Sequence, residues 1–288
     1  MSLAGPDSSL TQLLEQGYCV VKDAVAPATI AALEADLAPI FDATPFGQGH
    51  FYGFRTKRFG SLLKRSPHAQ SLIMAPGILA LADAILGEAC DRIQLNVAQA
   101  IEIHPGEREQ FAHRDHDMWA GVKGSHEFLV NVMWPLTRFT AENGATRIYP
   151  RSHGKAGMAQ QELGEPLVAA CEPGSAICFL GSTAHGAGAN LSQDVRRGLV
   201  VGYSLGWLKP YENNWLAYPP AVARHFSPDL AALVGYSQHR PNLGNYEGQC
   251  PSVLLRDDVP EHLGAVDALR PDQEAMIEEA LGLVTAPL

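Results

Sequence analysis

Two separate stretches of the chain carry side chains that could bind one metal ion. The first, residues 110–119, contains His113 and Asp115 with a single residue between them. Side chains alternate between the two faces of a β-strand, so we expect this imidazole and this carboxylate to point to the same side. The second, residues 181–190, is rich in glycine and contains His185, shortly after the apolar run 176–180. Two histidines and one carboxylate on one side of a metal leave its other positions open, as in non-haem Fe(II) sites that activate oxygen.

A histidine and an aspartate one residue apart are a weak signal alone, because such tripeptides arise by chance and usually lie on a solvated face. The signal is strengthened by His185 and by the arginine pair Arg196 and Arg197, which enters the next apolar run. The residues alone leave two alternatives open. The histidines could be ordinary hydrogen-bonded side chains, and either arginine could form a surface salt bridge.

Composition narrows the class of protein. With 288 residues, of which 46% are hydrophobic, the chain is long enough to bury a core. A formal charge of −10 without a run of basic residues argues against nucleic acid as a partner. The five cysteines are widely spaced and lack a C-x-x-C pair, so we expect buried free thiols in a reducing compartment. Residues 1–7 do not resemble a signal peptide, and no apolar run is long enough to span a membrane, so we expect a cytoplasmic protein.

The elements that must position these residues follow from hydrophobic periodicity and from glycine and proline. Helices are expected over 8–16, from Pro27 onward, over 77–86, near 219–225 and 228–235, and from Pro271, the last carrying Met276, Ile277, Ala280, Leu281 and Leu283. Strands are expected over 18–21, 93–103, 127–136, 145–149, 175–180 and 198–208, with a further strand carrying His113 and Asp115.

Residues 44–65 mix glycine with aromatic residues and predict a loop, either as a wall that faces the substrate or as a packed irregular segment. Short strands at this spacing favour a sandwich or barrel. We therefore predict a single domain, residues 1–288, that is mainly β. Its core would be a double-stranded β-helix of the jelly-roll or cupin-like kind, which brings His113, His185 and Arg196 together. Helices at both ends of the chain would buttress this core.

At these residues the chain resembles the phytanoyl-CoA dioxygenase (PhyH) family of Fe(II)- and 2-oxoglutarate-dependent oxygenases. The resemblance runs from about residue 17 to about residue 251. Its most specific parts are Gln110-x-x-His113-x-Asp115, the turn 142–146 leading to 150–153, and His185-x-x-x-x-Asn190-x-Ser192-x-x-x-Arg196. The segments 56–63, 235–236 and 243–244 further resemble the branch of the family that tailors natural products.

The chain departs from the family pattern in one turn. Arg151 stands where the family usually has glycine. Asp115 is retained, whereas related halogenases have a small residue there, so halogenation is disfavoured.

The resemblance implies a role for each candidate residue. His113, Asp115 and His185 would bind Fe(II) and leave positions for 2-oxoglutarate and O2. Arg196 would hold the far carboxylate of 2-oxoglutarate through a planar bidentate contact, and Arg197 would take this role if the strand register differed by one residue. Gln110 and Thr146 match positions that hydrogen-bond the cosubstrate, although either could be a structural polar residue.

The other side chains near the motif have weaker assignments. We interpret His116, Asp117 and His153 as groups that support the ligands or face solvent. An apolar substrate pocket could be shaped by several large side chains, with core packing as the alternative for each: Trp119, Met118, Phe51, Tyr52 and Trp134.

The predicted function is that of an Fe(II)- and 2-oxoglutarate-dependent dioxygenase that oxidises an unactivated C–H bond of a hydrophobic small molecule. Hydroxylation, desaturation or ring formation would each fit, in secondary-metabolite biosynthesis, with ascorbate as reductant in vitro and a homodimer as the assembly. One alternative is a phytanoyl-CoA-like acyl hydroxylase, although no basic cluster points to the CoA phosphates. The others are a Zn-dependent hydrolase, which would have no use for Arg196 as a clamp, and a catalytically silent binding module.

Overall fold

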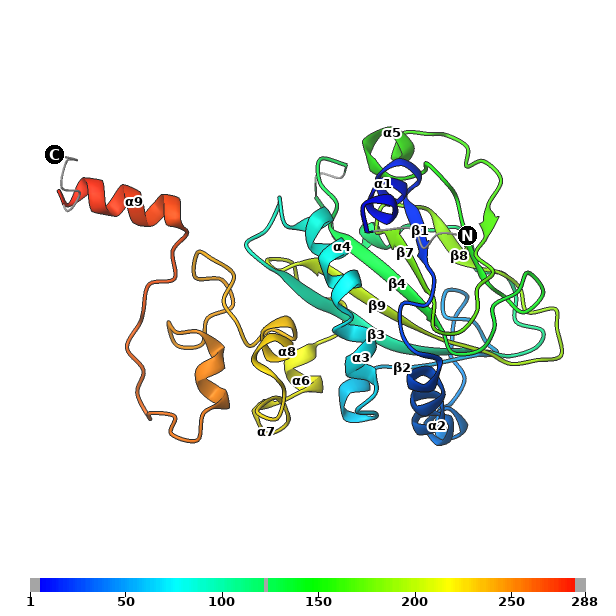
Figure 1. Cartoon of the computed structure of the whole chain (residues 1–288), viewed down its shortest axis with the longest axis horizontal. Coiled ribbons are helices and arrows are strands. Elements are labelled where there is room, and N and C mark those ends of the chain that lie inside the picture. The colour runs from blue at the N-terminus through cyan, green and yellow to red at the C-terminus, as the bar shows by residue number, and fades with distance from the viewer. Residues whose placement is uncertain (1–5, 122–123, 283–288) are drawn as a thin grey trace.

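The computed structural model describes residues 6–121 and 124–282, in which helices accompany two antiparallel sheets (Figure 1). The larger sheet has the strand order β1-β7-β4-β9-β3-β2 and the smaller one the order β6-β5-β8. The strands of the larger sheet are β1 (Tyr18–Val21), β2 (Thr56–Phe59), β3 (Ile93–Ile103), β4 (Leu129–Pro135), β7 (Ala176–Leu180) and β9 (Arg196–Leu205). The strands of the smaller sheet are β5 (Thr146–Ile148), β6 (Leu167–Val168) and β8 (His185–Ala187).

The larger sheet is buried on both faces, and its strands β4 and β7 are accordingly almost continuously apolar. Along β4 every residue is buried, with Val130, Val132 and Trp134 on the face that packs with the helices. The alternate residue Met133 joins a second apolar cluster, to which Ile148 of the smaller sheet also belongs. The two sheets therefore pack against each other through this second cluster, and the candidate site lies at the same interface.

The helices in the first third of the chain supply the other half of the main core. They are α1 (Pro6–Gln16), α2 (Pro27–Ala43), α3 (Ala69–Ile73) and α4 (Pro76–Leu86). In α2 the residues Ile30, Leu33 and Leu37 are buried, as their helical spacing predicts, and Phe41 is buried in the next turn, whereas Ile40 of the predicted stripe is only partly buried. Proline at the first turn of α2 and α4 is compatible with a helix start, because the first backbone N–H groups have no partner within the helix.

The remaining helical turns are short. They are η1 (Leu62–Lys64), η2 (Asp115–Met118), α5 (Gly154–Met158), α6 (Asn214–Ala217), α7 (Pro220–Ala223), α8 (Pro228–Leu233), η3 (Pro251–Leu255) and α9 (Pro271–Ala280). The sequence did not predict several of the helical elements, which are α3, α5, α6, η1, η2 and η3. It also predicted a loop over all of 44–65, but residues 56–59 form β2, which pairs with β3 from Thr56 to Phe59.

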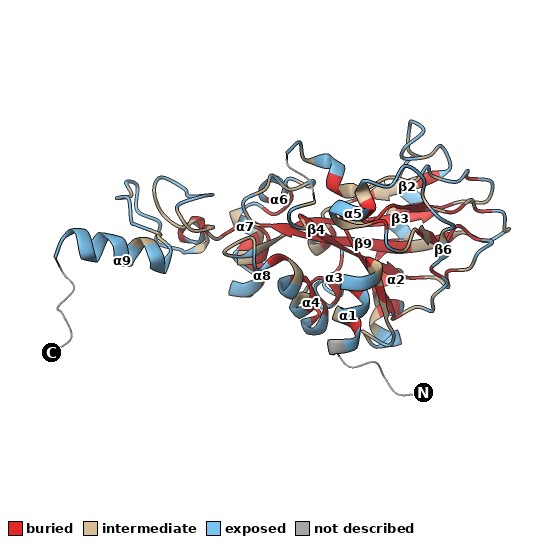
Figure 2. Cartoon of the chain, turned by 90° about the horizontal axis from the view of Figure 1, so that it is seen from above, coloured by how far each residue is buried: buried red, intermediate tan, exposed pale blue. Residues whose placement is uncertain are grey.

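The last helix corrects a prediction. Helices at both ends were expected to buttress the core, but α9 has no buried residue and lies away from the sheets (Figures 1 and 2). Its apolar side chains Met276, Ile277 and Leu281 are exposed. We call residues 239–282 the C-terminal arm. Leu283, also assigned to this helix from the sequence, and residues 1–5, on which the signal-peptide argument partly rested, lie outside the described residues.

Within the described residues, no helix combines the length and apolarity that crossing a membrane requires. The five cysteines are free thiols; Cys19 and Cys178 are buried, whereas the other three are only half-buried.

Arg151, which stands where the family usually has glycine, adopts a left-handed conformation with φ of 60°. The turn thus keeps a backbone geometry that favours glycine, although an arginine occupies it.

Candidate metal centre

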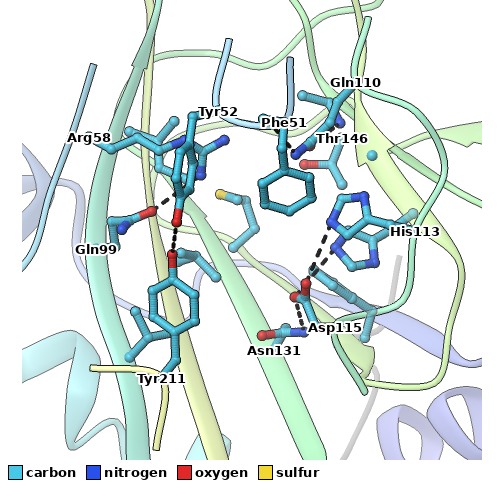
Figure 3. A pocket seen from close by; sticks show the side chains of 18 of the residues that line it. Phe51, Tyr52, Arg58, Gln99, Gln110, His113, Asp115, Asn131, Thr146 and Tyr211 are labelled. Atoms are coloured by element: carbon cyan, nitrogen blue, oxygen red, sulfur yellow. Dashed lines mark hydrogen bonds and ion pairs between the residues drawn. The ribbon is translucent and has the colours of Figure 1, made fainter. Parts of the chain in front are cut away.

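The three predicted metal ligands converge at one point in the structure. His113 Nε2 lies 3.5 Å from Asp115 Oδ1, and His185 Nε2 lies 3.5 Å from Asp115 Oδ2. Among the described residues this is the set of histidine, cysteine and acidic side chains whose ligand atoms could hold a metal, all within 4.8 Å of one another. Figure 3 shows His113 and Asp115 on one side of the pocket, joined by the dashed contacts.

The backbone brings the ligands together in a different way from the one predicted. His113 is not in a strand; it forms an isolated antiparallel bridge with His185, with both N–H···O distances at 2.9 Å. Asp115 is the first residue of η2. The backbone of Arg114 is extended, so Asp115 still lies beside His113. The argument from strand alternation therefore identified the right pair of residues, although these residues do not form a strand.

Close backbone approach is needed beside this bridge. A Cβ atom at Gly186 would lie 2.9 Å from the carbonyl oxygen of Gln110, a separation that real Cβ atoms essentially never show. Glycine therefore lets the segment that carries His185 lie against the one that carries His113.

Hydrogen bonds fix which nitrogen of each histidine faces the site. His113 Nδ1 lies 3.0 Å from the Phe111 carbonyl oxygen, and His185 Nδ1 lies 3.1 Å from that of Thr183. Because a carbonyl only accepts, each Nδ1 carries a hydrogen, and it is Nε2 of each ring that faces Asp115 and can offer its lone pair to a metal. Burial lowers the pKa of His185, which favours its neutral form.

The charge balance of the site fits a divalent cation. Burial raises the pKa of Asp115, but both histidines and Asn131 offset this, so that its pKa lies below the ordinary value. The site thus offers one carboxylate and two imidazole lone pairs, a set that suits Fe(II). Asn131 donates from Nδ2 to Asp115 Oδ2 at 3.0 Å and is almost fully buried on β4. Sequence reasoning missed Asn131, although it is a polar residue inside an otherwise apolar run.

The two neighbouring arginines separate as the strand alternation predicts. Arg196 is 1% exposed and lines the pocket, with Nη2 3.5 Å from Thr146 Oγ1 and its guanidinium 3.7 Å from the Phe139 ring centroid. Burial, with Arg58 adding to it, lowers the pKa of Arg196 to about 9. Across the described ranges no carboxylate pairs with Arg196, so a buried cation faces the pocket without a counter-ion.

Arg197 has its partners on the opposite face of β9. Its Nε donates to Glu102 Oε2 at 2.7 Å, and its guanidinium packs over the Phe41 ring. Of the two arginines, Arg196 is the one that can reach a ligand in the pocket.

The pocket occupies about 920 Å³, including its open mouth, and lies between the two sheets. Gln110 and Thr146 line it, as predicted. Gln110 is tied at both ends of its amide: Nε2 donates to the Phe51 carbonyl at 3.0 Å, and Oε1 accepts from the Ala187 N–H at 3.3 Å. The structure thus brings Gln110 to the site while also giving it a structural role.

Some of the proposed wall residues line the pocket and others do not. Phe51, Tyr52 and Met118 line it. Trp134 is fully buried in the main core, and Trp119 instead donates from Nε1 to the Lys209 carbonyl at 2.8 Å. The core alternative therefore holds for Trp134.

His116 and His153 contact other parts of the protein. His116 is buried and stacked on Phe128, which excludes the solvent-facing alternative for this residue. His153 contacts the Leu14 carbonyl through Nε2 at 2.9 Å and thereby helps to hold α1. Asp117 is exposed.

Most of the wall opposite the metal ligands was not predicted; Tyr52 is the residue of this wall that the sequence analysis named as a pocket candidate. Arg58 of β2 donates from Nη1 to Gln99 Oε1 at 3.2 Å, and Tyr52 and Tyr211 share a hydrogen bond of 2.7 Å between their hydroxyl groups (Figure 3). Asn96 also lines the pocket. Arg58 lies within the segment 56–63 that resembles natural-product enzymes, so this segment was the available signal.

Comparison with known proteins agrees with this geometry. The family model described as "Phytanoyl-CoA dioxygenase (PhyH)" matches residues 13–198. The chain is 29% identical over 241 residues to the dioxygenase trt7 of Aspergillus terreus, covering 80% of this chain and 84% of that protein. It is 28% identical over 258 residues to the dioxygenase olcK of Penicillium canescens, covering 85% of each.

The fold is also similar to solved structures. One is the epimerase SnoN in complex with Fe3+, alpha ketoglutarate and nogalamycin RO, with a TM-score of 0.59 and 17% identity over 72% of this chain and 86% of that one. The family model covers more than half of the chain, and the residues it spans include all three convergent ligands. The chain therefore belongs to the phytanoyl-CoA dioxygenase (PhyH) family and is a non-haem Fe(II)- and 2-oxoglutarate-dependent dioxygenase.

Proposed function

We propose that this dioxygenase oxidises an unactivated C–H bond of a hydrophobic small molecule in secondary-metabolite biosynthesis, with Fe(II) held by His113, Asp115 and His185. The observation that carries the proposal is the convergence of these side chains in a pocket that also holds the buried, unpaired Arg196. The carboxylate and the two imidazoles suit a metal cation, and the guanidinium of Arg196 suits an anion.

When bound, iron and 2-oxoglutarate would allow O2 to act as the oxidant: 2-oxoglutarate would supply two of the four electrons that O2 accepts, giving succinate and CO2, and the substrate C–H bond would supply the other two. The residues of this chain bind and orient. Arg196 forms a fork that matches a carboxylate, and Thr146 supplies a hydroxyl group beside it. Asn131 fixes the carboxylate of Asp115, and the carbonyls of Phe111 and Thr183 fix the two imidazole rings.

The apolar part of the wall selects the substrate and excludes water. It includes Ile101, Ile103, Met133, Phe179 and Val200. These side chains offer no competing polar group, so a bound hydrocarbon skeleton would be oriented by shape and by the polar groups elsewhere in the pocket. Hydroxylation, desaturation and ring formation would follow from which C–H the pocket presents.

The comparisons support secondary metabolism over acyl-CoA oxidation. The structure of SnoN, described as an enzyme from nogalamycin biosynthesis, contains a nogalamycin compound together with alpha ketoglutarate. We carry this substrate class to the present chain as a proposal. A phytanoyl-CoA-like acyl hydroxylase remains the second candidate, since the family model bears that description.

We further propose that the two sheets form the walls of a double-stranded β-helix within a single domain. The shared apolar cluster and the antiparallel pairing of both sheets support this. A homodimer and a cytoplasmic location stay predictions. The exposed apolar side chains of the C-terminal arm, among them Leu243, Val266 and Met276, support the dimer, which light scattering during gel filtration would test.

The test of the activity uses full-length protein with Fe(II), ascorbate, 2-oxoglutarate and air. We expect succinate to form, and library compounds to gain the mass of one oxygen atom or lose that of two hydrogen atoms. Hydrolysis of a library compound with zinc, and no succinate with iron, would favour the hydrolase. Binding of a compound without any turnover would favour the silent binding module.

A further inference from the structure

Asn96 lies at an irregularity of β3 beside the pocket. In the pairing of β3 with β9, Leu95 is opposite Tyr203 and Val97 is opposite Gly202, so Asn96 is an extra residue in a β-bulge. Bulges re-aim side chains and are frequent next to active sites. Val97 and the odd-numbered residues after it line the pocket by strand alternation, and the bulge adds Asn96 to the same wall.

The bulge is held in place by the segment that follows β9. The Tyr211 N–H donates to Asn96 Oδ1 at 2.9 Å, the Glu212 N–H donates to the Asn96 carbonyl at 2.9 Å, and Asn214 Nδ2 donates to the Leu95 carbonyl at 2.7 Å. The first of these bonds also fixes the orientation of the Asn96 amide. A backbone N–H can only donate, so the atom that it reaches must be the oxygen.

The other end of this amide lacks an acceptor. Asn96 is 0% exposed, and its Nδ2 has no hydrogen-bond partner among the residues that the structure describes. A buried donor without an acceptor is costly, whereas a ligand oxygen in the pocket would satisfy it. Asn96 is among the residues that line the pocket, so a molecule bound there is a source of such an oxygen.

The part of the pocket wall around Asn96 is polar. It carries the hydroxyl pair of Tyr52 and Tyr211, together with Gln99 and Arg58, and it lies across the pocket from His113 and Asp115 (Figure 3). Two phenol groups that share one hydrogen bond keep a second O–H free to donate. An oxygen bound on this wall would leave the rest of the molecule facing the metal ligands.

We propose that Asn96 Nδ2 is a specificity-determining donor that recognises a carbonyl oxygen on the substrate. The substrate class is then an apolar molecule that carries a ketone, lactone or amide carbonyl at the end remote from the oxidised C–H. This inference deepens the proposed function and rests on it. A site built to bond an oxygen discriminates against the analogue that lacks it, because its own polar group is then left unpaired.

The test measures binding of three probes to full-length protein loaded with Mn(II) and 2-oxoglutarate, by ligand-observed NMR. The probes are 2-decalone, 2-decalol and decalin, which share one skeleton. One hydrogen bond contributes about 0.5–1.5 kcal/mol, so we expect the wild type to bind 2-decalone roughly 2- to 10-fold more tightly than decalin.

The decisive variant is Asn96→Asp. It keeps the oxygen that accepts from the Tyr211 N–H and replaces the donor with a second oxygen, which carries a negative charge when ionised. Asn96→Leu removes the same donor without adding a charge, so a purely structural role of Asn96 predicts that both variants keep the probe preferences. We expect the preference for 2-decalone over decalin to disappear, while 2-decalol, which can donate to the new oxygen, still binds. Asn245→Asp, at an exposed asparagine of the C-terminal arm, is the matched control and should bind as the wild type does.

If Asn96→Asp does not fold, Asn96→Leu removes the donor with an apolar side chain of similar size and should likewise abolish the ketone preference. The inference is overturned if the wild type does not prefer 2-decalone, or if either folded Asn96 variant keeps the preference. Failure of the wild type to form succinate from 2-oxoglutarate would instead count against the proposed function, whatever the probes show.

Discussion

The two ends of the pocket are built in different ways. At the metal end, the ligands come from two short segments whose backbones pair directly through the bridge between His113 and His185. At the opposite end, the polar groups come from a strand bulge at Asn96 and from the irregular segments that carry Tyr52 and Tyr211. The metal ligands thus depend on direct backbone pairing between two segments, whereas the polar groups proposed to select the substrate are brought together only by packing. Variants at each end should therefore affect different measurements.

The largest effect is expected for Asp115→Ala. Loss of the carboxylate removes one of three ligand groups, so Fe(II)-dependent succinate formation should fall to background and Fe(II) affinity should drop steeply. Titration with Fe(II) and a succinate assay measure both. Normal circular dichroism would show that the fold persists, and wild-type turnover by this variant would rule out the proposed ligand set.

The second-largest effect is expected for Arg196→Gln. Charge-assisted hydrogen bonds contribute about 1.5–3 kcal/mol, so the KM for 2-oxoglutarate should rise on the order of 10- to 100-fold. Arg197→Gln is the matched control on the same strand. Because Arg197 bonds the buried Glu102, this variant should lower the free energy of unfolding by about 1–3 kcal/mol and leave the KM nearly unchanged. The reverse pattern would assign the cosubstrate to Arg197.

Asn131→Leu tests whether the hydrogen bond from Asn131 to Asp115 supports metal binding. Asn131 touches Asp115 and stands outside the three ligands, and loss of such outer hydrogen bonds typically reduces metal affinity or activity about 10- to 100-fold. Competition of the loaded protein with a chelator measures the Fe(II) affinity. An unchanged affinity would mean that the backbone alone positions Asp115.

The smallest effect is expected for Tyr52→Phe, at the opposite end. The bond between the Tyr52 and Tyr211 hydroxyl groups is exposed, so its loss should cost under about 1 kcal/mol of stability and leave the KM for 2-oxoglutarate unchanged. Thermal unfolding and a 2-oxoglutarate titration check this. A large rise in that KM would show that the two ends of the pocket are coupled.

Sequence reasoning performed best where the pattern is local. The predicted strands over 18–21 and 93–103 have the bounds of β1 and β3, and the buried stripe of α2 follows from its periodicity. Reasoning failed where tertiary contacts override the pattern. The segment 56–59 pairs with β3 despite its glycine-rich surroundings, and Asp115 starts a helical turn. The sequence also could not show that α9 would lie exposed. The apolar residues of a helix do not by themselves indicate whether another part of the protein packs against them.

The sequence alone determined the chemistry of this protein, because the ligand types, their spacing and the arginine eleven residues after His185 are properties of short segments. Strand alternation even separated Arg196 from Arg197. Only the tertiary structure decided what stands opposite the metal ligands. Asn96, Arg58 and Tyr211 come from a bulge, a strand and a loop that are far apart in sequence, and their side chains share one pocket only because the sheet and the segment after β9 pack together.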